Sequence, residues 1–236
     1  MLKNKSMPGG HMFDRSMRNI AFVVVGAVFG LLLHISVYAN DWGNCLNGDV
    51  WLTVDTSDSM SGYESSMSET IGFIARKIID SYPNSRVGLV IFNTNPYIVK
   101  DLTRDTSQFE DLALTAGGGT KIANALLGVS SHHEMNLEKE REYSEDYRRI
   151  IFLISDGEDK INDVFRIAKY IRTKSAAWDI FSVHYFKGKY ESSANQKNAN
   201  LMMQVSGSRY NIDSNLYVSS SLDGLPEFMR EQFSCM

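Results

Sequence analysis

Oxygen-bearing side chains recur at alternate positions in one short polar segment of the chain. Asp55, Ser57 and Ser59 are each separated by a single residue. Alternate residues of an extended segment point the same way, so three side-chain oxygens can face one point. Carboxylate and hydroxyl oxygens, without imidazole or thiolate, suit Mg²⁺, Mn²⁺ or Ca²⁺ and disfavour Zn²⁺ or Cu²⁺. The segment is therefore a candidate cation-binding loop.

Two later loops carry side chains of the same chemistry. Thr120 follows the three glycines 117–119, which allow the backbone to approach a neighbour closely. Asp156 comes directly after an apolar run and is followed by Gly157. The three loops together offer two carboxylates and three hydroxyls. A set with so few charges leaves a coordination position open, which a carboxylate from another molecule could fill.

The segments around these loops alternate between strand-like and helix-like patterns. Apolar and β-branched runs predict strands at 50–54, 86–92, 96–100, 150–154, 180–185 and 209–212. Helical spacing of apolar residues predicts helices at 60–81, 106–112, 120–131, 162–174, 195–205 and 222–233. The charged stretch 134–149 reads as a solvated helix end and connector.

This alternation predicts an α/β fold. We expect a doubly wound, mostly parallel sheet of about six strands, with helices on both faces and 96–100 as an antiparallel edge strand. Ligands of such folds bind at the carboxyl ends of the strands. Asp55 and Asp156 lie directly after predicted strands, which is where a binding site is expected.

At residues 46–234 the chain resembles the von Willebrand factor A domain, also called the integrin I-like domain, with its metal-ion-dependent adhesion site. That family has an Asp-x-Ser-x-Ser motif after the first strand, a threonine in a later loop and an aspartate after the fourth strand. The segment 55–59, Thr120 and Asp156 match these in order. The resemblance also implies the Rossmann-like sheet of that family.

The resemblance assigns a role to each matching residue. Ser57, Ser59 and Thr120 would ligate the ion through their hydroxyls, and Asp55 and Asp156 would act largely through bound waters. The remaining position would take an aspartate or glutamate from a protein partner. The expected cofactor is Mg²⁺, with Mn²⁺ or Ca²⁺ as alternatives, because spacing alone does not fix the cavity geometry that separates them.

The amino-terminal residues are predicted to form a targeting segment. The run Ile20–Val37 has 18 residues, of which only His34 and Ser36 are polar, and arginines precede it. Small residues at Val37 and Ala39 favour cleavage before residue 40, so residues 1–39 form a predicted signal peptide. Translation from Met17 would give this signal its usual short basic start. The alternative is an uncleaved membrane anchor over residues 20–37, since 18 residues just span a bilayer.

The remaining residues, 40–236, read as a single domain, because no linker or repeat divides them. They hold 20 basic and 27 acidic side chains, a net charge of −7. An acidic domain repels nucleic acid and anionic lipid, so no nucleic-acid partner is expected. Membrane association is expected only if residues 20–37 stay uncleaved.

The chain has two cysteines, Cys45 and Cys235, near the two ends of the predicted domain. In an oxidising compartment they are expected to form a disulfide that closes nearly the whole domain into one loop. Extracellular members of the resembled family have such a bridge. A signal peptide and a disulfide together predict a secreted or periplasmic protein, or one anchored on the outer side of a membrane.

No enzyme signature competes with the predicted binding site. The chain has no Gly-x-Ser-x-Gly elbow, and the adjacent His132 and His133 lack the spacing of a zinc-protease helix. No nucleophile is paired with a base. The sequence therefore predicts a non-enzymatic, exported module that binds a protein partner through its ion. The alternative is a membrane-anchored scaffold or assembly factor.

Overall fold

A computed structural model describes residues 47–136, 147–173, 178–186, 192–206 and 216–219. The chain divides into two compact units, Met1–Trp42 and Gly43–Met236. All described residues belong to the second unit. Within these ranges no helix combines the length and the apolar character that crossing a bilayer requires.

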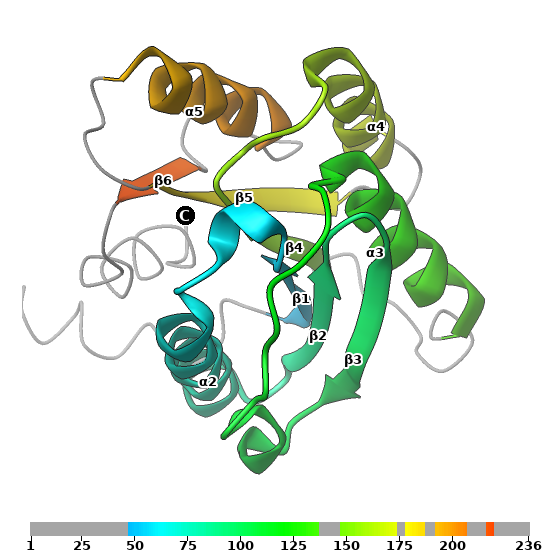
Figure 1. The fold of residues 1–236 in the computed structure, drawn as a ribbon. Helices are drawn as coiled ribbons and strands as arrows, with labels where there is room; N and C mark the ends of the chain where they lie inside the picture. Colours follow the sequence, from blue (N-terminus) through cyan, green and yellow to red (C-terminus); the bar gives the residue numbers. More distant parts are fainter. Residues whose placement is uncertain (1–46, 137–146, 174–177, 187–191, 207–215, 220–236) are drawn as a thin grey trace, which may run out of the picture. The chain divides into compact units, whose positions relative to one another are not determined.

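The described part of the second unit is built on one six-stranded sheet (Figure 1). Its strands are β1 (Gly48–Asp55), β2 (Arg86–Phe92), β3 (Pro96–Thr103), β4 (Arg148–Ser155), β5 (Trp178–Tyr185) and β6 (Leu216–Ser219). Their spatial order is β3-β2-β1-β4-β5-β6. All neighbouring pairs are parallel except β2 and β3, which are antiparallel. The predicted doubly wound sheet with an antiparallel edge strand is therefore confirmed.

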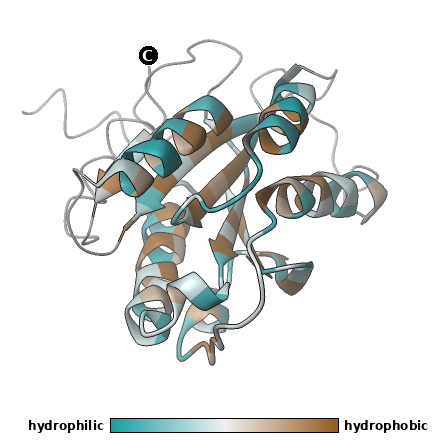
Figure 2. Cartoon of the chain, turned by 45° about the horizontal axis from the view of Figure 1, so that its top comes forward, coloured by the Kyte–Doolittle hydropathy of each residue, from teal (hydrophilic) through white to brown (hydrophobic). Residues whose placement is uncertain are grey.

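Helices cover both faces of the sheet. They are α2 (Glu64–Ser81), α3 (Ile122–Asn136), α4 (Ile161–Thr173) and α5 (Ser193–Val205), with short 3-10 turns η2 (Asp58–Met60) and η3 (Thr106–Phe109). On one face, α2 and η3 pack on β1, β2, β4 and β5. On the other face, α3, α4 and α5 pack on the same strands. Figure 2 shows the hydrophobic strands between helices that are hydrophobic along one side only.

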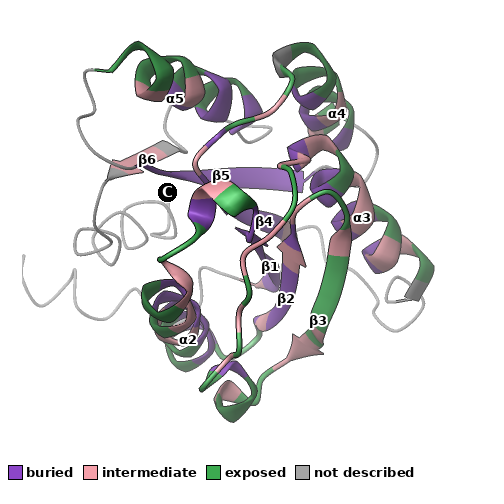
Figure 3. Cartoon of the chain, viewed as in Figure 1, coloured by how far each residue is buried: buried purple, intermediate pink, exposed green. Residues whose placement is uncertain are grey.

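The central strands are buried because helices cover both of their faces. Every residue of β1 and β5 is buried, whereas the edge strand β3 has exposed and half-exposed residues (Figure 3). Apolar residues therefore run almost continuously along the central strands instead of alternating with polar ones. Two cores result, one on each side of the sheet. Both extend to the strand ends from which the predicted binding loops emerge.

Local backbone geometry shifts several predicted element bounds. The predicted helix 60–81 is a 3-10 turn and a separate helix, because Gly62 between them has a φ of +89°. The predicted helix 106–112 is only the turn η3, and Asp111 has a φ of +50°. The chain enters β4 at Arg148, so the end of the predicted connector 134–149 is strand.

Several predictions fall on residues that the structure does not describe. These are the signal or anchor segment 1–39, both cysteines, the predicted strand 209–212 and the predicted helix 222–233. The last described strand is instead β6, which pairs with β5 over Leu216–Ser219. The disulfide between Cys45 and Cys235 and the cleavage before residue 40 stay predictions.

A buried polar cluster lies at the amino ends of the central strands. Arg86 donates two hydrogen bonds of 2.9 Å to the carboxylate of Asp49, which has no exposed surface. His133 lies near the end of α3. Trp51 Nε1 is 3.3 Å from its Nδ1, and Arg149 Nε is 3.3 Å from its Nε2. A neutral imidazole can accept through one nitrogen, and a protonated one through neither. The surroundings therefore favour the neutral ring.

This burial predicts a pH dependence of stability. Burial is the largest cause that lowers the pKa of His133 from 6.5 to about 4, against the opposing charge of Asp49. The folded chain then binds this proton more weakly than the unfolded chain. The free energy of unfolding should fall by up to about 3 kcal/mol as the pH drops from 6.5 towards 4.

Urea unfolding of His133→Gln across this pH range checks that expectation. The variant should lose this part of the pH slope. The neighbouring His132 is the matched control, because its ring is not fully buried and lies 2.7 Å from Asp101. His132→Gln should keep the loss of stability that is assigned to His133. If the free energy of unfolding depends on pH equally in the parent chain and in His133→Gln, the pH dependence does not come from His133.

Candidate functional site

The first predicted loop begins where β1 ends, and its polar side chains face one another. The Ser57 backbone N–H donates to Asp55 Oδ1 at 2.9 Å, which folds the loop back onto the strand end. The hydroxyl oxygens of Ser57 and Ser59 lie 3.0 Å apart. Asp55 and Ser57 are almost completely buried, and Ser59 is half-buried. The alternation expected from the sequence therefore brings these three side chains together.

A buried hydroxyl joins this loop to the end of β4. Ser155 Oγ donates to Asp55 Oδ2 at 2.6 Å and accepts from the Gly157 N–H at 3.0 Å. Gly157 has a φ of +80°, and a Cβ there would lie 2.9 Å from the Asn198 carbonyl oxygen, so only glycine fits. Asp156 lies between the two, at the same edge of the sheet as Asp55.

Backbone hydrogen bonds fix the glycine loop against the first loop. The Gly117 N–H donates to the Thr56 carbonyl at 2.9 Å, and the Asp58 N–H donates to the Gly118 carbonyl at 3.0 Å. Gly118 has a φ of +78°, which a residue with a side chain rarely adopts. The loop continues through the half-buried Thr120 into α3. The structure thus brings all five predicted site residues to three adjoining loops.

The electrostatics of the site favour a cation. Burial is the main cause that raises the pKa of Asp55 from 3.8 to about 6, and the nearby charge of Asp156 raises it further. Hydrogen bonds from Ser155 and Ser57 oppose this rise. Neither Asp55 nor Asp156 forms an ion pair with a basic side chain of the described ranges. A positive ion between the two carboxylates would compensate their repulsion.

The donor set has a defined chemical character. Among the described residues, no group of three or more His, Cys, Asp or Glu side chains is placed to hold a metal ion. Asp55 and Asp156 together with the nearby hydroxyls make a donor set that a hard cation accepts and a soft one does not. The residues present fit a small divalent ion. Their roles as ligands stay a prediction.

Two residues of the site were not predicted from the sequence. Ser155 directly follows the predicted strand 150–154 and was assigned no role, although a hydroxyl beside Asp156 is a signal for one. Asp159 accepts from the Ile122 N–H at 2.8 Å and from the Lys160 N–H at 2.6 Å, so it joins the start of α3 to the start of α4. Nothing in the sequence around Asp159 indicates that it binds the backbone of Ile122, which lies far away in the chain.

Fold and site together define a class of protein: α/β domains with polar loops at the carboxyl edge of a mostly parallel sheet. Residues 50–158 match the family model of the von Willebrand factor type A domain. This match supports the von Willebrand factor type A domain that the motif predicted. No curated protein sequence matches the chain significantly.

Solved structures share the fold at low sequence identity. Proximal thread matrix protein 1 of the mussel byssus, with a zinc-occupied metal site, has a TM-score of 0.57 and 15% identity over 80% of this chain. The pilus adhesin SpaC of Lactobacillus rhamnosus GG has a TM-score of 0.62 and 14% identity over 82%. The pili tip protein Mfa5 domain of Porphyromonas gingivalis has a TM-score of 0.55 and 12% identity over 81%. The chain spans 45%, 30% and 98% of these structures, respectively.

The bridging hydroxyl of Ser155 predicts a measurable loss of stability. Ser155→Ala leaves Asp55 Oδ2 and the Gly157 N–H without their buried partner. The free energy of unfolding should fall by about 1–3 kcal/mol. Urea unfolding measures this change.

Ser182 on the adjacent strand β5 is the matched control. It is equally buried, but its hydroxyl has no hydrogen-bond partner among the described residues. Ser182→Ala should therefore change stability by less than about 0.5 kcal/mol or increase it. Equal losses for the two variants would show that the bridge from Ser155 contributes nothing.

Proposed function

We propose that this chain is an exported binding module that holds a divalent cation and uses it to bind an acidic side chain of a protein partner. Asp55, Ser57, Ser59, Thr120 and Asp156 hold the ion. The observation that carries the proposal is the meeting of two carboxylates, which form no ion pair within the described ranges, with two hydroxyl oxygens 3.0 Å apart. A bound ion supplies a positive centre that attracts a carboxylate.

The spacing of the two serine oxygens is compatible with Mg²⁺ or Mn²⁺ as the ion. Two neighbouring ligands of an octahedral Mg²⁺, each at about 2.1 Å, are separated by about 3.0 Å. The same right angle at Ca²⁺ distances of about 2.3–2.6 Å separates them by about 3.3–3.7 Å. Ser57 Oγ and Ser59 Oγ are 3.0 Å apart and within hydrogen-bond distance of each other, a separation that the smaller ion could take over without moving either side chain.

The surrounding residues keep the site organised and selective for an acid. The bond from Ser155 orients Asp55, and the backbone bonds to Gly117 and Gly118 hold the glycine loop in place. Few rotatable groups must then be ordered when a partner arrives, which lowers the entropic cost of binding. A carboxylate is attracted to a positive centre more strongly than a neutral side chain is, and a basic side chain is repelled. No nucleophile paired with a base lies in these loops, so we propose binding and not catalysis.

The solved relatives support an adhesive role outside the cytosol. Two of them are pilus proteins, and a third is a thread matrix protein whose metal site holds zinc. Together with the signal-like segment 1–39 they favour a secreted or periplasmic protein. The predicted single domain 40–236 and the bridge between Cys45 and Cys235 belong to the same proposal.

Metal binding is tested by thermal unfolding of the purified chain in EDTA, Mg²⁺, Mn²⁺, Ca²⁺ and Zn²⁺. An ion that binds only the folded chain stabilises it by about 2.7 kcal/mol at a hundredfold excess over its dissociation constant. We expect a rise in Tm with Mg²⁺ or Mn²⁺ that Asp55→Ala abolishes. Zn²⁺ is included because one relative holds it.

Asp80 on α2 provides the control variant, because its carboxylate is exposed and remote from the three loops. Asp80→Ala should keep the full response to the ion. No rise in Tm with any ion at millimolar concentration would contradict the proposal. A rise that persists in Asp55→Ala would place the ion elsewhere.

Export is tested by sequencing the amino terminus of the mature protein. A terminus at Asn40 is expected if residues 1–39 are a cleaved signal peptide. A terminus upstream of Ile20 would favour the second candidate, a scaffold or assembly factor anchored by residues 20–37. The apolar segment is long enough to span a bilayer, and this length is the observation that favours the second candidate.

A further inference from the structure

An open pocket of about 410 Å³ adjoins the proposed ion site. Its volume lies in the range of about 300–1,000 Å³ that is usual for ligand pockets. It is lined by Thr120, Lys121, Glu158, Asp159, Lys160, Ala194, Lys197 and Asn198. Thr120 belongs to both the pocket and the proposed ion site. A partner bound at the ion therefore reaches this pocket directly.

One acid and one lysine of the pocket are already engaged within the fold. The side chain of Asp159 is 4% exposed and lies 3.8 Å from Lys121 Nζ. It also accepts from the backbone of Ile122 and Lys160. The charge of Asp159 is thus compensated by Lys121 and by the start of α3. Asp159 and Lys121 therefore do not determine the charge of a ligand that the pocket would bind.

Two further lysines remain available to a ligand. Lys160 and Lys197 are exposed, and neither forms an ion pair with another described residue. Glu158 is the acid that remains on the pocket wall, and it is exposed as well. The first turns of α3 and α5 contain no acidic residue. Asp159 already compensates the amino-terminal end of α3, so only the positive end of α5 adds to the potential of the two lysines.

We propose that this pocket binds a second acidic side chain of the same protein partner, beside the carboxylate that reaches the ion. The inference rests on the proposed function and names its partner: a segment with several aspartates or glutamates. The whole chain has a net charge of −4, so a locally basic pocket is not a consequence of its composition. A segment held at the ion presents its neighbouring acids at high effective concentration.

Two labelled peptides test this pocket by fluorescence polarisation in Mg²⁺ and in EDTA. One peptide has six glutamates, and the other has one glutamate and five glutamines. Lys160→Gln combined with Lys197→Gln should weaken the six-glutamate peptide about tenfold, since two exposed ion pairs are lost. The one-glutamate peptide should change less than twofold. High salt should reduce the difference, because it screens exposed charges.

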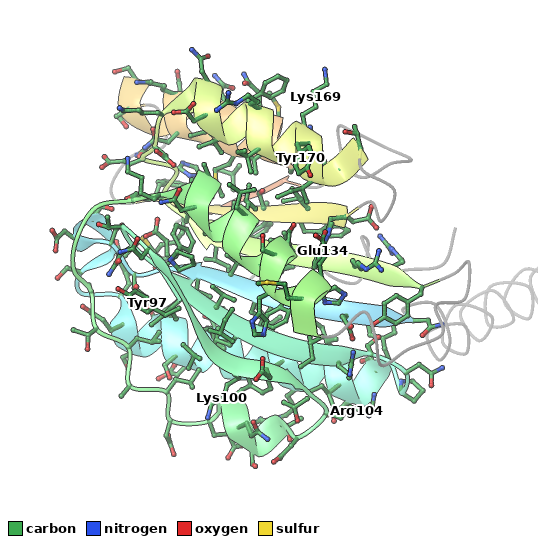
Figure 4. All side chains as sticks on the ribbon, turned by 90° about the vertical axis from the view of Figure 1, so that its right-hand side faces the viewer. Tyr97, Lys100, Arg104, Glu134, Lys169 and Tyr170 are labelled. Carbon is green, nitrogen blue, oxygen red and sulfur yellow. The ribbon has the colours of Figure 1, made fainter. Side chains whose placement is uncertain are left out.

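The control removes two lysines that lie elsewhere. Lys77 on α2 is exposed, and Lys169 projects from the far half of α4 (Figure 4). Lys77→Gln combined with Lys169→Gln makes the same change in net charge and should bind both peptides like the parent chain. An unchanged affinity of the pocket variant for the six-glutamate peptide would overturn the inference. So would no binding of that peptide in Mg²⁺.

The two proposals fail in different ways. If EDTA leaves both peptides bound but the lysine variant still weakens the six-glutamate peptide, the ion-dependent function is wrong and the acidic pocket stands. If Mg²⁺ promotes binding of both peptides equally and the lysine variant has no effect, the ion-dependent function stands and the pocket is wrong.

Discussion

The buried hydrogen bond from Ser155 to Asp55 is the contact on which the site depends. It joins the ends of the two central strands at 2.6 Å and orients a carboxylate that is almost fully removed from water. A buried carboxylate without such a donor would bear the full cost of desolvation. The same hydroxyl accepts from Gly157, so one side chain positions both acidic loops. The glycine loop is then fixed against the first of these loops by its own backbone hydrogen bonds.

The sheet explains why these loops meet. β1 lies between β2 and β4, and all three strands run in parallel, so their carboxyl ends reach one edge. The glycine loop is bonded to the loop after β1, and α3 then runs from that edge towards the opposite one, where His133 joins the buried cluster of Asp49 and Arg86. The proposed oxygen ligands lie at one edge, and the compensated charges lie at the other.

Much of this arrangement could be predicted from the sequence, because apolar runs mark buried strands and the motif residues follow them directly. The break at Gly62 could not, since helical periodicity continues across it while a positive φ interrupts the backbone. The bridging role of Ser155 and the tether at Asp159 depend on partners many residues away, which spacing along the chain does not reveal. The neutral state of His133 likewise depends on burial that only the packed fold creates.

The order of strands in the sheet also determines when the site can form. Asp55 and Ser155 are separated by 100 residues in the chain, yet they occupy neighbouring central strands. Closing so long a loop costs entropy before any contact offsets it, and chains with such distant pairings fold slowly. Until β4 docks beside β1, the two acidic loops are unconnected. If the chain is exported unfolded, the proposed ion site would therefore form only after most of the chain has crossed the membrane.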